Sequence, residues 1–264
     1  MVQRTPMPTT LKLDASQPGT VVLTLDRPKS LNALNEVMVA ELQDALATIG
    51  RDHTVRVVVL TGSGRGFCAG LDLRNFGASM PDDGDPAIDV LRFQEMMAAL
   101  PQAFRALPQP VIAAVNGPAV GGGLALCLAA DVRICSRSAS FGNAAIRIGL
   151  SGAEMGMSYH LPRVVGTSVA ADWMLPGRTV SAEEADRRGL VSELVDDDLL
   201  VPRALELAAQ IVAHSSLGVS LTKRAIQVNT DAPDLFAAVE LENRNQIITL
   251  ATEESVRERA KWSK

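Results

Sequence analysis

The sequence predicts an α/β fold with a helical C-terminal part, from three observations. Runs rich in β-branched residues, typical of buried strands, occupy residues 20–26, 55–60 and 111–115. A helical pattern separates the first two runs, and this β-α-β order favours an α/β protein. From about residue 199 the pattern is helical throughout. We therefore divide the chain into a core, residues 1–198, and a C-terminal helical region, residues 199–264.

The composition excludes whole classes of function. The chain has 264 residues, enough for one large domain or a domain with an appendage, and 47% of them are hydrophobic, which supports a sizeable core. A formal net charge of −5 gives no basic footprint for nucleic acid, and an aromatic content of 3% argues against base-stacking platforms. We therefore expect no nucleic-acid partner.

The cysteines and the first residues favour a cytoplasmic protein. Cys68, Cys127 and Cys135 form an odd set in apolar surroundings without metal-ligand spacing, and we expect buried thiols in a reducing compartment. Residues 1–10, MVQRTPMPTT, lack the apolar stretch of a secretory signal and are expected to form a loose tail. No metal or redox cofactor is implied.

The first strand, helix and strand follow one another closely. The segment 20–26, TVVLTLD, alternates with a β-branched bias and predicts a strand. Asn35 can cap a helix that runs to about Ile49, with Gly50 as its stop. The run at 55–60, VRVVVL, predicts a buried strand.

A glycine-rich loop, TGSGRGFCAG at 61–70, follows that strand. Its spacing does not fit G-x-G-x-x-G at a helix start and it lacks G-K-[ST], so it indicates a dinucleotide site only weakly. It suggests instead a backbone open to a ligand near 69–71. The acidic, turn-rich segment 77–87 predicts a mobile surface loop, and the pattern at 88–107 predicts a helix.

The stretch at 111–131, VIAAVNGPAVGGGLALCLAAD, combines a buried strand, a turn at 116–118, three glycines and helix-forming residues. The amides of Gly121 to Gly123 are expected to open a helix, where amides lack intrahelical partners and meet the positive end of the dipole. Such a place suits an anion, or an oxygen that becomes one. Two alternatives remain. One is a membrane span, which the turn residues disfavour, and the other is a glycine turn that serves packing alone.

Two short strands are predicted at 131–135 and 139–141, before a loop that leads to a helix. In this loop, at 149–156, Ser151 and Glu154 match the capping-box pattern S-x-x-E. The pattern predicts that both residues serve the start of the helix.

The same pattern occurs again at Ser181 and Glu184, before a helix that ends at Gly189. Beyond it, three helices are predicted to start near Pro202, Ser216 and Pro233.

Five segments match one known family in the same order. They are LDRP at 25–28 with LNAL at 31–34, FCAGLDL at 67–73, AAVNGPAVGGG at 113–123, LPGR at 175–178 and ADRRGLV at 185–191. Together they resemble the enoyl-CoA hydratase/isomerase (crotonase) family, and the resemblance covers roughly residues 20–250.

The resemblance implies a spiral core of repeated ββα units and C-terminal helices that assemble a homotrimer or a dimer of trimers. It implies an acyl-CoA thioester as ligand, with coenzyme A as part of the substrate. It also places an oxyanion hole on the backbone N–H groups of Leu71 and Gly122. A thioester carbonyl gains negative charge when the acyl chain is deprotonated or attacked, and two fixed donors stabilise that charge.

The resemblance also implies a set of contacts to CoA or substrate. The residues are Arg27, Lys29, Leu31, Ala33, Ala69, Gly70, Leu71, Asp72, Leu73 and Gly121. Arg27 and Lys29 would meet phosphates as charged donors. The alternative for these two is a solvated strand end.

The sequence departs from the family at both usual catalytic glutamates, whose positions correspond to Ala125 and Ala145. Because an acid/base group typically contributes about 10²–10⁴ to the rate, efficient hydration by the usual route is in doubt. Glu154 is the main remaining candidate, and its alternative role is the capping box with Ser151. Asp72 is a weaker candidate, expected to point to solvent or CoA.

We therefore expect an enzyme that hydrates an enoyl-CoA or isomerises its double bond. The alternative is a catalytically silent acyl-CoA binder, motivated by the two alanines. A nucleic-acid-binding relative is disfavoured by the acidic balance. The chain after Thr252 is short and charged, and Lys261 with Trp262 would be a shortened form of the segment that helps to hold CoA.

Overall fold

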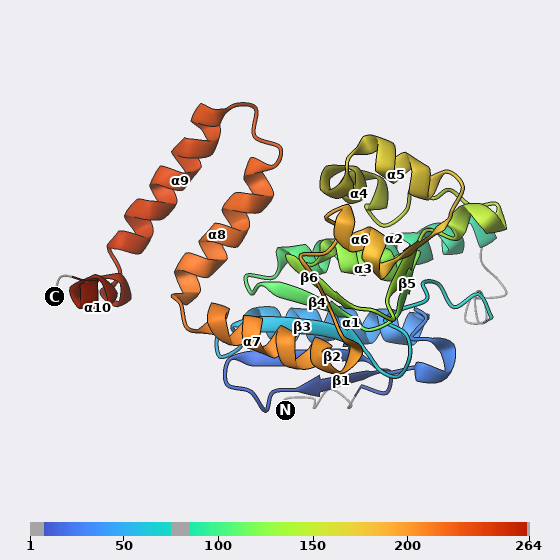
Figure 1. Ribbon diagram of the computed structural model, residues 1–264, viewed down its shortest axis with the longest axis horizontal. Helices are drawn as coiled ribbons and strands as arrows, with labels where there is room; N and C mark the ends of the chain where they lie inside the picture. The colour runs from blue at the N-terminus through green and yellow to red at the C-terminus, as the bar shows by residue number, and fades with distance from the viewer. Residues whose placement is uncertain (1–7, 75–84, 263–264) are drawn as a thin grey trace.

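A six-stranded sheet forms the centre of the protein in the computed structural model, which describes residues 8–74 and 85–262 (Figure 1). Its strand order is β1-β2-β3-β4-β6-β9. β1 is antiparallel to β2, and the other neighbouring pairs are parallel. The strands span Leu11–Asp14, Thr20–Leu25, Val57–Gly62, Val111–Val115, Val132–Ser136 and Glu193–Val195.

A three-stranded sheet contains β5 (Pro118–Val120), β7 (Ser140–Gly142) and β8 (Thr179–Ser181), in that order. β5 and β7 are parallel, whereas β8 is antiparallel to β7. The carboxyl ends of β5 and β7 therefore lie at one edge of this sheet. The chain segments that follow these two strands meet there and form the candidate site.

Alternate residues of β3 pack into two different hydrophobic layers. Val58 and Leu60 belong to the larger core with α1, α2 and α3, whereas Val57 and Val59 pack with α7. Strand side chains alternate between faces, so burial on both sides explains the continuous apolar run. These helices are Glu36–Arg51, Pro86–Ala106, Gly122–Ala129 and Leu200–Val212.

Shorter elements connect these layers. They are the 3₁₀ turns η1 (Pro28–Ser30), η2 (Ala145–Ile148) and η3 (Asp197–Leu199), and the helices α4 (Met157–Val165), α5 (Thr167–Met174) and α6 (Ala182–Arg187).

Helices α8 (Ser216–Asn229), α9 (Leu235–Leu250) and α10 (Glu253–Trp262) project from the body as an arm (Figure 1). α8 and α9 lie side by side. Phe236 is 86% exposed, and Leu235 and Ile247 are also largely exposed. Exposed apolar residues gathered on one arm are typical of an interaction surface.

Several predicted elements are confirmed. Asn35 caps α1 by accepting a hydrogen bond from the Met38 N–H, and Ser181 caps α6 through the Glu184 N–H. Glu184 does not complete the predicted box, because its carboxylate pairs with Arg178. The predicted strands and C-terminal helices form within two or three residues of the expected positions.

The expected stop of α1 at Gly50 is wrong, since the helix continues to Arg51. The small size of Gly50 serves packing instead, because a Cβ there would lie 3.3 Å from Leu107 Cδ2. The predicted loose tail falls mostly on residues 1–7, outside the described residues, but Thr9 and Thr10 hydrogen-bond the Glu41 carboxylate.

The predicted loop at 77–87 falls mostly outside the described residues, and its last two residues already belong to α2. The alternative of a membrane span at 111–131 is wrong, because this stretch is divided among β4, β5 and α3. In the described part of the chain, no single helix has the length and hydropathy to cross a membrane. One pair of helical segments, Asp197–Val212 and Ser216–Asn229, has the length and composition for a span when taken together, but the pair is bent by 109°.

Candidate active site

The helix α3 begins at three glycines, directly after the short strand β5. Gly121 is the N-cap residue with φ +52°, a conformation that favours glycine. A Cβ on Gly123 would lie 2.0 Å from the Cys68 carbonyl oxygen, and one on Gly122 would lie 2.9 Å from Leu34 Cδ1. The glycines therefore allow the helix to begin in contact with the segment around Cys68, and the prediction that they open a helix is confirmed.

Backbone hydrogen bonds hold the segment around Cys68 on both sides. The Cys68 N–H donates to the Pro118 carbonyl at 3.0 Å, and the Cys68 carbonyl accepts from the Val120 N–H at 2.9 Å. Two residues later, the Gly70 carbonyl accepts from the Leu34 N–H at 2.7 Å. The segment is thus fixed between β5 and the chain before α1.

Gly70 brings the amides of Leu71 and Gly122 close together. It has φ +85°, and a Cβ on it would lie 2.7 Å from the Val120 carbonyl oxygen and 3.3 Å from the Gly122 nitrogen. Among the described residues, neither the Leu71 N–H nor the Gly122 N–H has a hydrogen-bond acceptor. Two such donors, one of them at a helix N-terminus, can stabilise a developing oxyanion.

The carboxyl group of Glu154 faces the same place. A Cβ on Gly121 would lie 3.3 Å from Glu154 Oε1. Glu154 is half-buried, and burial raises the pKa of its carboxyl group above the ordinary 4.5. Its side chain has no hydrogen-bond or ion-pair partner in the part of the chain that the structure describes. Such a carboxyl group is suited to general acid-base chemistry.

The alternative role of Glu154 in a capping box is wrong. Helix α4 begins at Met157, and its N-cap residue is Gly156, which makes no side-chain cap. Ser151 Oγ accepts from a backbone N–H two residues further along, within the loop. The helix cannot start earlier, because Met155 has φ +47° and Gly156 has φ +79°. This left-handed pair, which the sequence analysis missed, leaves the Glu154 side chain free for the site.

Asn143, which the sequence analysis also missed, fixes the loop that carries Glu154. It is buried, its amide nitrogen donates to the Gly152 carbonyl, and its amide oxygen accepts from a backbone N–H two residues later at 3.4 Å. Asn143 directly follows Gly142, whose carbonyl accepts the Gly121 N–H at 2.9 Å. The one signal in the sequence is a polar residue two positions after the strand predicted at 139–141.

Arg27 and Asp72 form an ion pair beside the site. Arg27 Nη2 lies 2.7 Å from Asp72 Oδ2, and the two side chains are 18% and 5% exposed. Arg27 Nη1 also donates to the Ala33 carbonyl at 2.5 Å. A solvated strand end for Arg27 and a solvent-facing Asp72 are therefore both wrong. Asp72 balances the charge of Arg27, and a contact between Arg27 and a phosphate stays a prediction.

The other predicted CoA contacts lie on two adjacent segments. Lys29 and Leu73 are exposed, whereas Ala33 is buried. Leu31 has φ +51°, and the buried Asn32 after it fixes this turn by donating to two carbonyls of the glycine-rich loop. The site therefore has one free cation on this side, Lys29, among the residues predicted for CoA.

The two alanines that the sequence analysis places at the usual glutamate positions are buried. Ala125 lies within α3 and is 1% exposed, and Ala145 begins η2 and is 9% exposed. Ala145 lies two residues after Asn143 at the edge where β5 and β7 end. Neither methyl group can transfer a proton, so these positions add no acid or base to the site.

The described residues contain no group of three or more His, Cys, Asp or Glu side chains placed to hold a metal ion. Cys68, Cys127 and Cys135 are buried, as predicted. Burial raises the pKa of each thiol to about 12, so they remain protonated near neutral pH.

Comparison with known proteins gives consistent matches. The family model described as enoyl-CoA hydratase/isomerase matches residues 15–261. A probable enoyl-CoA hydratase of Mycobacterium leprae is 46% identical over 237 residues, which cover 89% of this chain and 80% of that protein.

Solved structures of similar proteins agree in fold. A monofunctional enoyl-CoA isomerase of M. smegmatis has a TM-score of 0.75 and 41% identity, covering 87% of this chain and 98% of that chain. An enoyl-CoA hydratase of Bacillus anthracis has a TM-score of 0.90 and 33% identity, and the match covers 97% of this chain and 96% of that chain.

Proposed function

Because the chain belongs to the enoyl-CoA hydratase/isomerase (crotonase) family, we propose that it shifts the double bond of an enoyl-CoA thioester, with Glu154 as the proton carrier. The two sheets and the C-terminal helices form the α/β crotonase fold. The observation that carries the proposal is the position of the Glu154 carboxyl group beside Gly121, next to the start of α3.

The amides of Leu71 and Gly122 would hold the thioester oxygen. Removal of a proton next to the thioester carbonyl turns the carbonyl into an enolate, and the negative charge gathers on its oxygen. Both N–H groups lack acceptors among the described residues, so no internal hydrogen bond has to break before they bind that oxygen. Losing one such donor costs roughly 10²–10³ in rate.

The Glu154 carboxylate would move the proton. It takes a proton from the carbon between the carbonyl and the double bond of a 3-enoyl thioester, and the C–H electron pair enters the enolate. Return of the same proton to the far carbon of the original double bond gives the conjugated 2-enoyl thioester. One carboxyl group completes this cycle, and no water is consumed.

This requirement for a single carboxyl group favours isomerisation over hydration. Hydration also needs a base that activates water, and the two positions that would supply glutamates hold Ala125 and Ala145. Asp72, a second candidate carboxylate, is paired with Arg27. The similar isomerase of M. smegmatis supports the same choice.

Hydration is the second candidate function, because the similar proteins of M. leprae and Bacillus anthracis are named as hydratases. It would require Glu154 both to activate water and to handle the proton on the acyl chain. A catalytically silent acyl-CoA binder is the third candidate, and the two alanines motivate it.

The chromophore of the conjugated enoyl thioester separates these functions. Purified protein is mixed with 3-enoyl-CoA and 2-enoyl-CoA substrates of several chain lengths, and the absorbance of the conjugated thioester is followed. We expect the absorbance to rise with the 3-enoyl substrate. A loss from the 2-enoyl substrate without that gain would replace isomerisation by hydration. Tight CoA-thioester binding without either change would favour the silent binder.

The pH dependence of the reaction should carry the signature of Glu154. As a base the carboxyl group must be ionised, so the rate falls as the pH drops through its pKa. Because burial raises that pKa, the acidic limb of kcat/KM against pH should lie above 4.5. A rate that stays constant down to pH 4.5 in folded protein would contradict the assignment.

Family membership supports two further parts of the proposal, the binding of CoA and assembly. We assign the CoA contact to the two segments that carry Lys29, Leu31 and Ala33 and residues 69–73, of which Lys29 and Leu73 are exposed. The exposed apolar residues of α9 support assembly through the arm, as a homotrimer or a dimer of trimers.

A further inference from the structure

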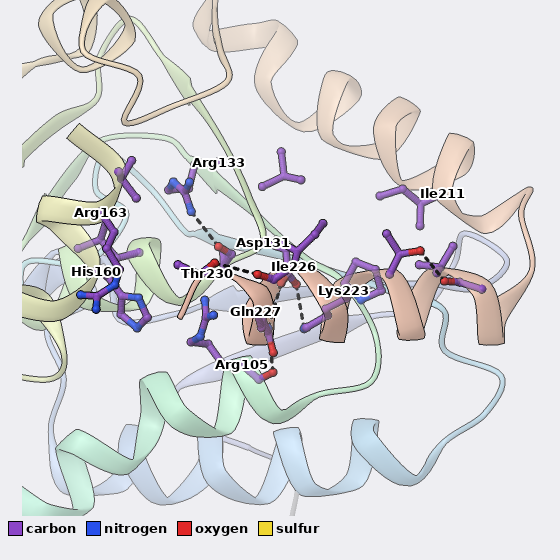
Figure 2. A pocket seen from close by; sticks show the side chains of 18 of the residues that line it. Arg105, Asp131, Arg133, His160, Arg163, Ile211, Lys223, Ile226, Gln227 and Thr230 are labelled. Atoms are coloured by element: carbon purple, nitrogen blue, oxygen red, sulfur yellow. Dashed lines mark hydrogen bonds and ion pairs between the residues drawn. The ribbon is translucent and has the colours of Figure 1, made fainter. Parts of the chain in front are cut away.

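A cavity of about 640 Å³ lies near the end of α3 opposite to the glycines. Elements α2, β6, α4 and α8 contribute its walls, as Figure 2 shows for the labelled side chains. Leu128 and Ala130 line it, whereas Gly122 opens the helix about 9 Å away from Leu128, at 1.5 Å per residue. The cavity is therefore separate from the candidate active site, and its volume is in the range of small-molecule sites.

Positive charge exceeds negative charge around this cavity. Its described lining includes four permanently charged or basic groups, Arg105, Arg133, Arg163 and Lys223, and one carboxylate, Asp131. Lys223 Nζ lies 2.8 Å from Asp131 Oδ2, so these two charges balance. Arg163 is balanced by Asp231 beside the cavity, because Arg163 Nη2 lies 3.0 Å from Asp231 Oδ1. Two arginines remain without a carboxylate counterpart.

Those two arginines differ in their neighbours. Arg133 donates to the carbonyls of Leu190 and Ala130 at 2.7 and 2.8 Å, and neutral acceptors of this kind leave its charge uncompensated. The guanidinium of Arg105 has no hydrogen-bond or ion-pair partner in the described residues. The guanidinium of Arg105, in the last turn of α2, thus offers five N–H donors in the planar geometry that matches a carboxylate.

His160 reports the same excess of positive charge from helix α4. Burial and the neighbouring charges of Arg105, Arg163 and Arg133 lower the pKa of its imidazole to about 4. His160 is therefore neutral at pH 7. Lys223 on α8 is the remaining cation of the lining, and Asp131 balances it.

Apolar side chains form a large part of the remaining wall, which also includes the polar residues Ser215, Thr222 and Thr230. Leu128, Val132, Val164, Ile211, Val219 and Ile226 line the cavity. A small inorganic anion would leave this surface without a partner. An uncharged apolar molecule would leave the guanidinium of Arg105 without one.

We propose that this cavity is a binding site for an amphipathic carboxylate, with its carboxylate on Arg105 and Arg133 and its apolar body against the walls that α4 and α8 provide. This site does not depend on the proposed isomerase function, because it uses none of the residues at the start of α3. The proposed ligand class is a free carboxylic acid with an alkyl chain of medium length.

Octanoate is the test probe, with 1-octanol and inorganic phosphate as comparison probes. Titration of the full chain is followed by calorimetry and by NMR of the His160 side chain. We expect saturable octanoate binding that raises the pKa of His160 from about 4, because a bound anion opposes the surrounding arginines. Octanol and phosphate should bind at least tenfold more weakly and leave His160 unchanged.

Two variants test the site from different directions. Arg105→Gln removes the unpartnered charge and should weaken octanoate binding by about tenfold. Val219→Phe fills the apolar part and should weaken binding without altering charge. The matched control is Arg224→Gln, an exposed arginine on the same helix α8 and outside the lining, which should bind octanoate as the native chain does.

Three results would overturn the proposal. One is the absence of saturable octanoate binding, whether the cavity is empty or covered by a second copy of the chain. Another is octanoate binding that leaves the titration of His160 unchanged. The last is unaltered binding in both Arg105→Gln and Val219→Phe. Octanoate binding should persist in Glu154→Gln and in the presence of a CoA thioester, so failure of the isomerase proposal would leave this test intact.

Discussion

Replacing Glu154 with glutamine is expected to lower kcat/KM for isomerisation by about 10²–10⁴. Glutamine keeps the size and the half-buried position of the side chain, but it cannot take the proton from the acyl chain. The amides of Leu71 and Gly122 are unchanged, so a CoA thioester should bind with its native affinity. Initial rates with a 3-enoyl-CoA and calorimetry with a non-reactive thioester measure the two quantities.

The matched control is Glu206→Gln on α7. Glu206 is exposed and contacts Arg203 at 3.2 Å, on a helix that packs on the other face of the main sheet from α3. The isomerisation rate of Glu206→Gln should equal that of the native chain. Full activity of Glu154→Gln would remove Glu154 as the proton carrier. Equal losses of thioester binding and rate would indicate that Glu154 holds the ligand and does not take part in the chemistry.

The sequence was sufficient to predict the strand-turn-helix at the centre of the site. The run at Val111–Val115 is short, β-branched and bounded by turn residues, which are local signals. The three glycines permit the positive φ of Gly121 and the close approach of Gly123 to Cys68, and helix-forming residues follow them directly, so α3 starts there. The strand β5 between them was missed, because it has three residues and begins at a proline.

The position of Glu154 could not be settled from local sequence. The S-x-x-E pattern predicts a cap only where a right-handed helix follows at once, and Met155 with Gly156 prevents this. A methionine at positive φ has no sequence signal of its own, because tertiary packing imposes it. Here a Cβ on Gly122 would meet Met155 Sδ at 3.1 Å, so the start of α3 and this loop are packed together.

The pairing of Arg27 with Asp72 was missed for a related reason. The two residues are 45 positions apart, and only the close approach of the segments before α1 and after Gly70 brings them to 2.7 Å. The sequence showed each charge as a separate candidate. Their partnership depends on the tertiary fold, and it changes what each can do for a ligand.

Replacing Gly70 with alanine is expected to lower kcat/KM by about 10²–10³, the cost of losing one oxyanion donor. The new Cβ would lie 2.7 Å from the Val120 carbonyl oxygen, and this backbone atom in β5 cannot move aside as a side chain can. The segment must therefore shift, and the Leu71 N–H moves away from the Gly122 N–H. Rates and urea unfolding are measured on the same preparation.

Gly189→Ala is the matched control, which separates the effect of backbone strain from the effect of the Cβ clash at Gly70. Gly189 has φ +74°, close to the +85° of Gly70, but nothing lies within 4 Å of a Cβ there. Both variants should lose about 1 kcal/mol of unfolding free energy from the left-handed backbone, and Gly70→Ala should lose more because of the clash. Only Gly70→Ala should lose activity. If folded Gly70→Ala retained the native rate, the spacing of the two amides would not matter to the reaction, and stabilisation of the enolate would have to come from elsewhere in the site.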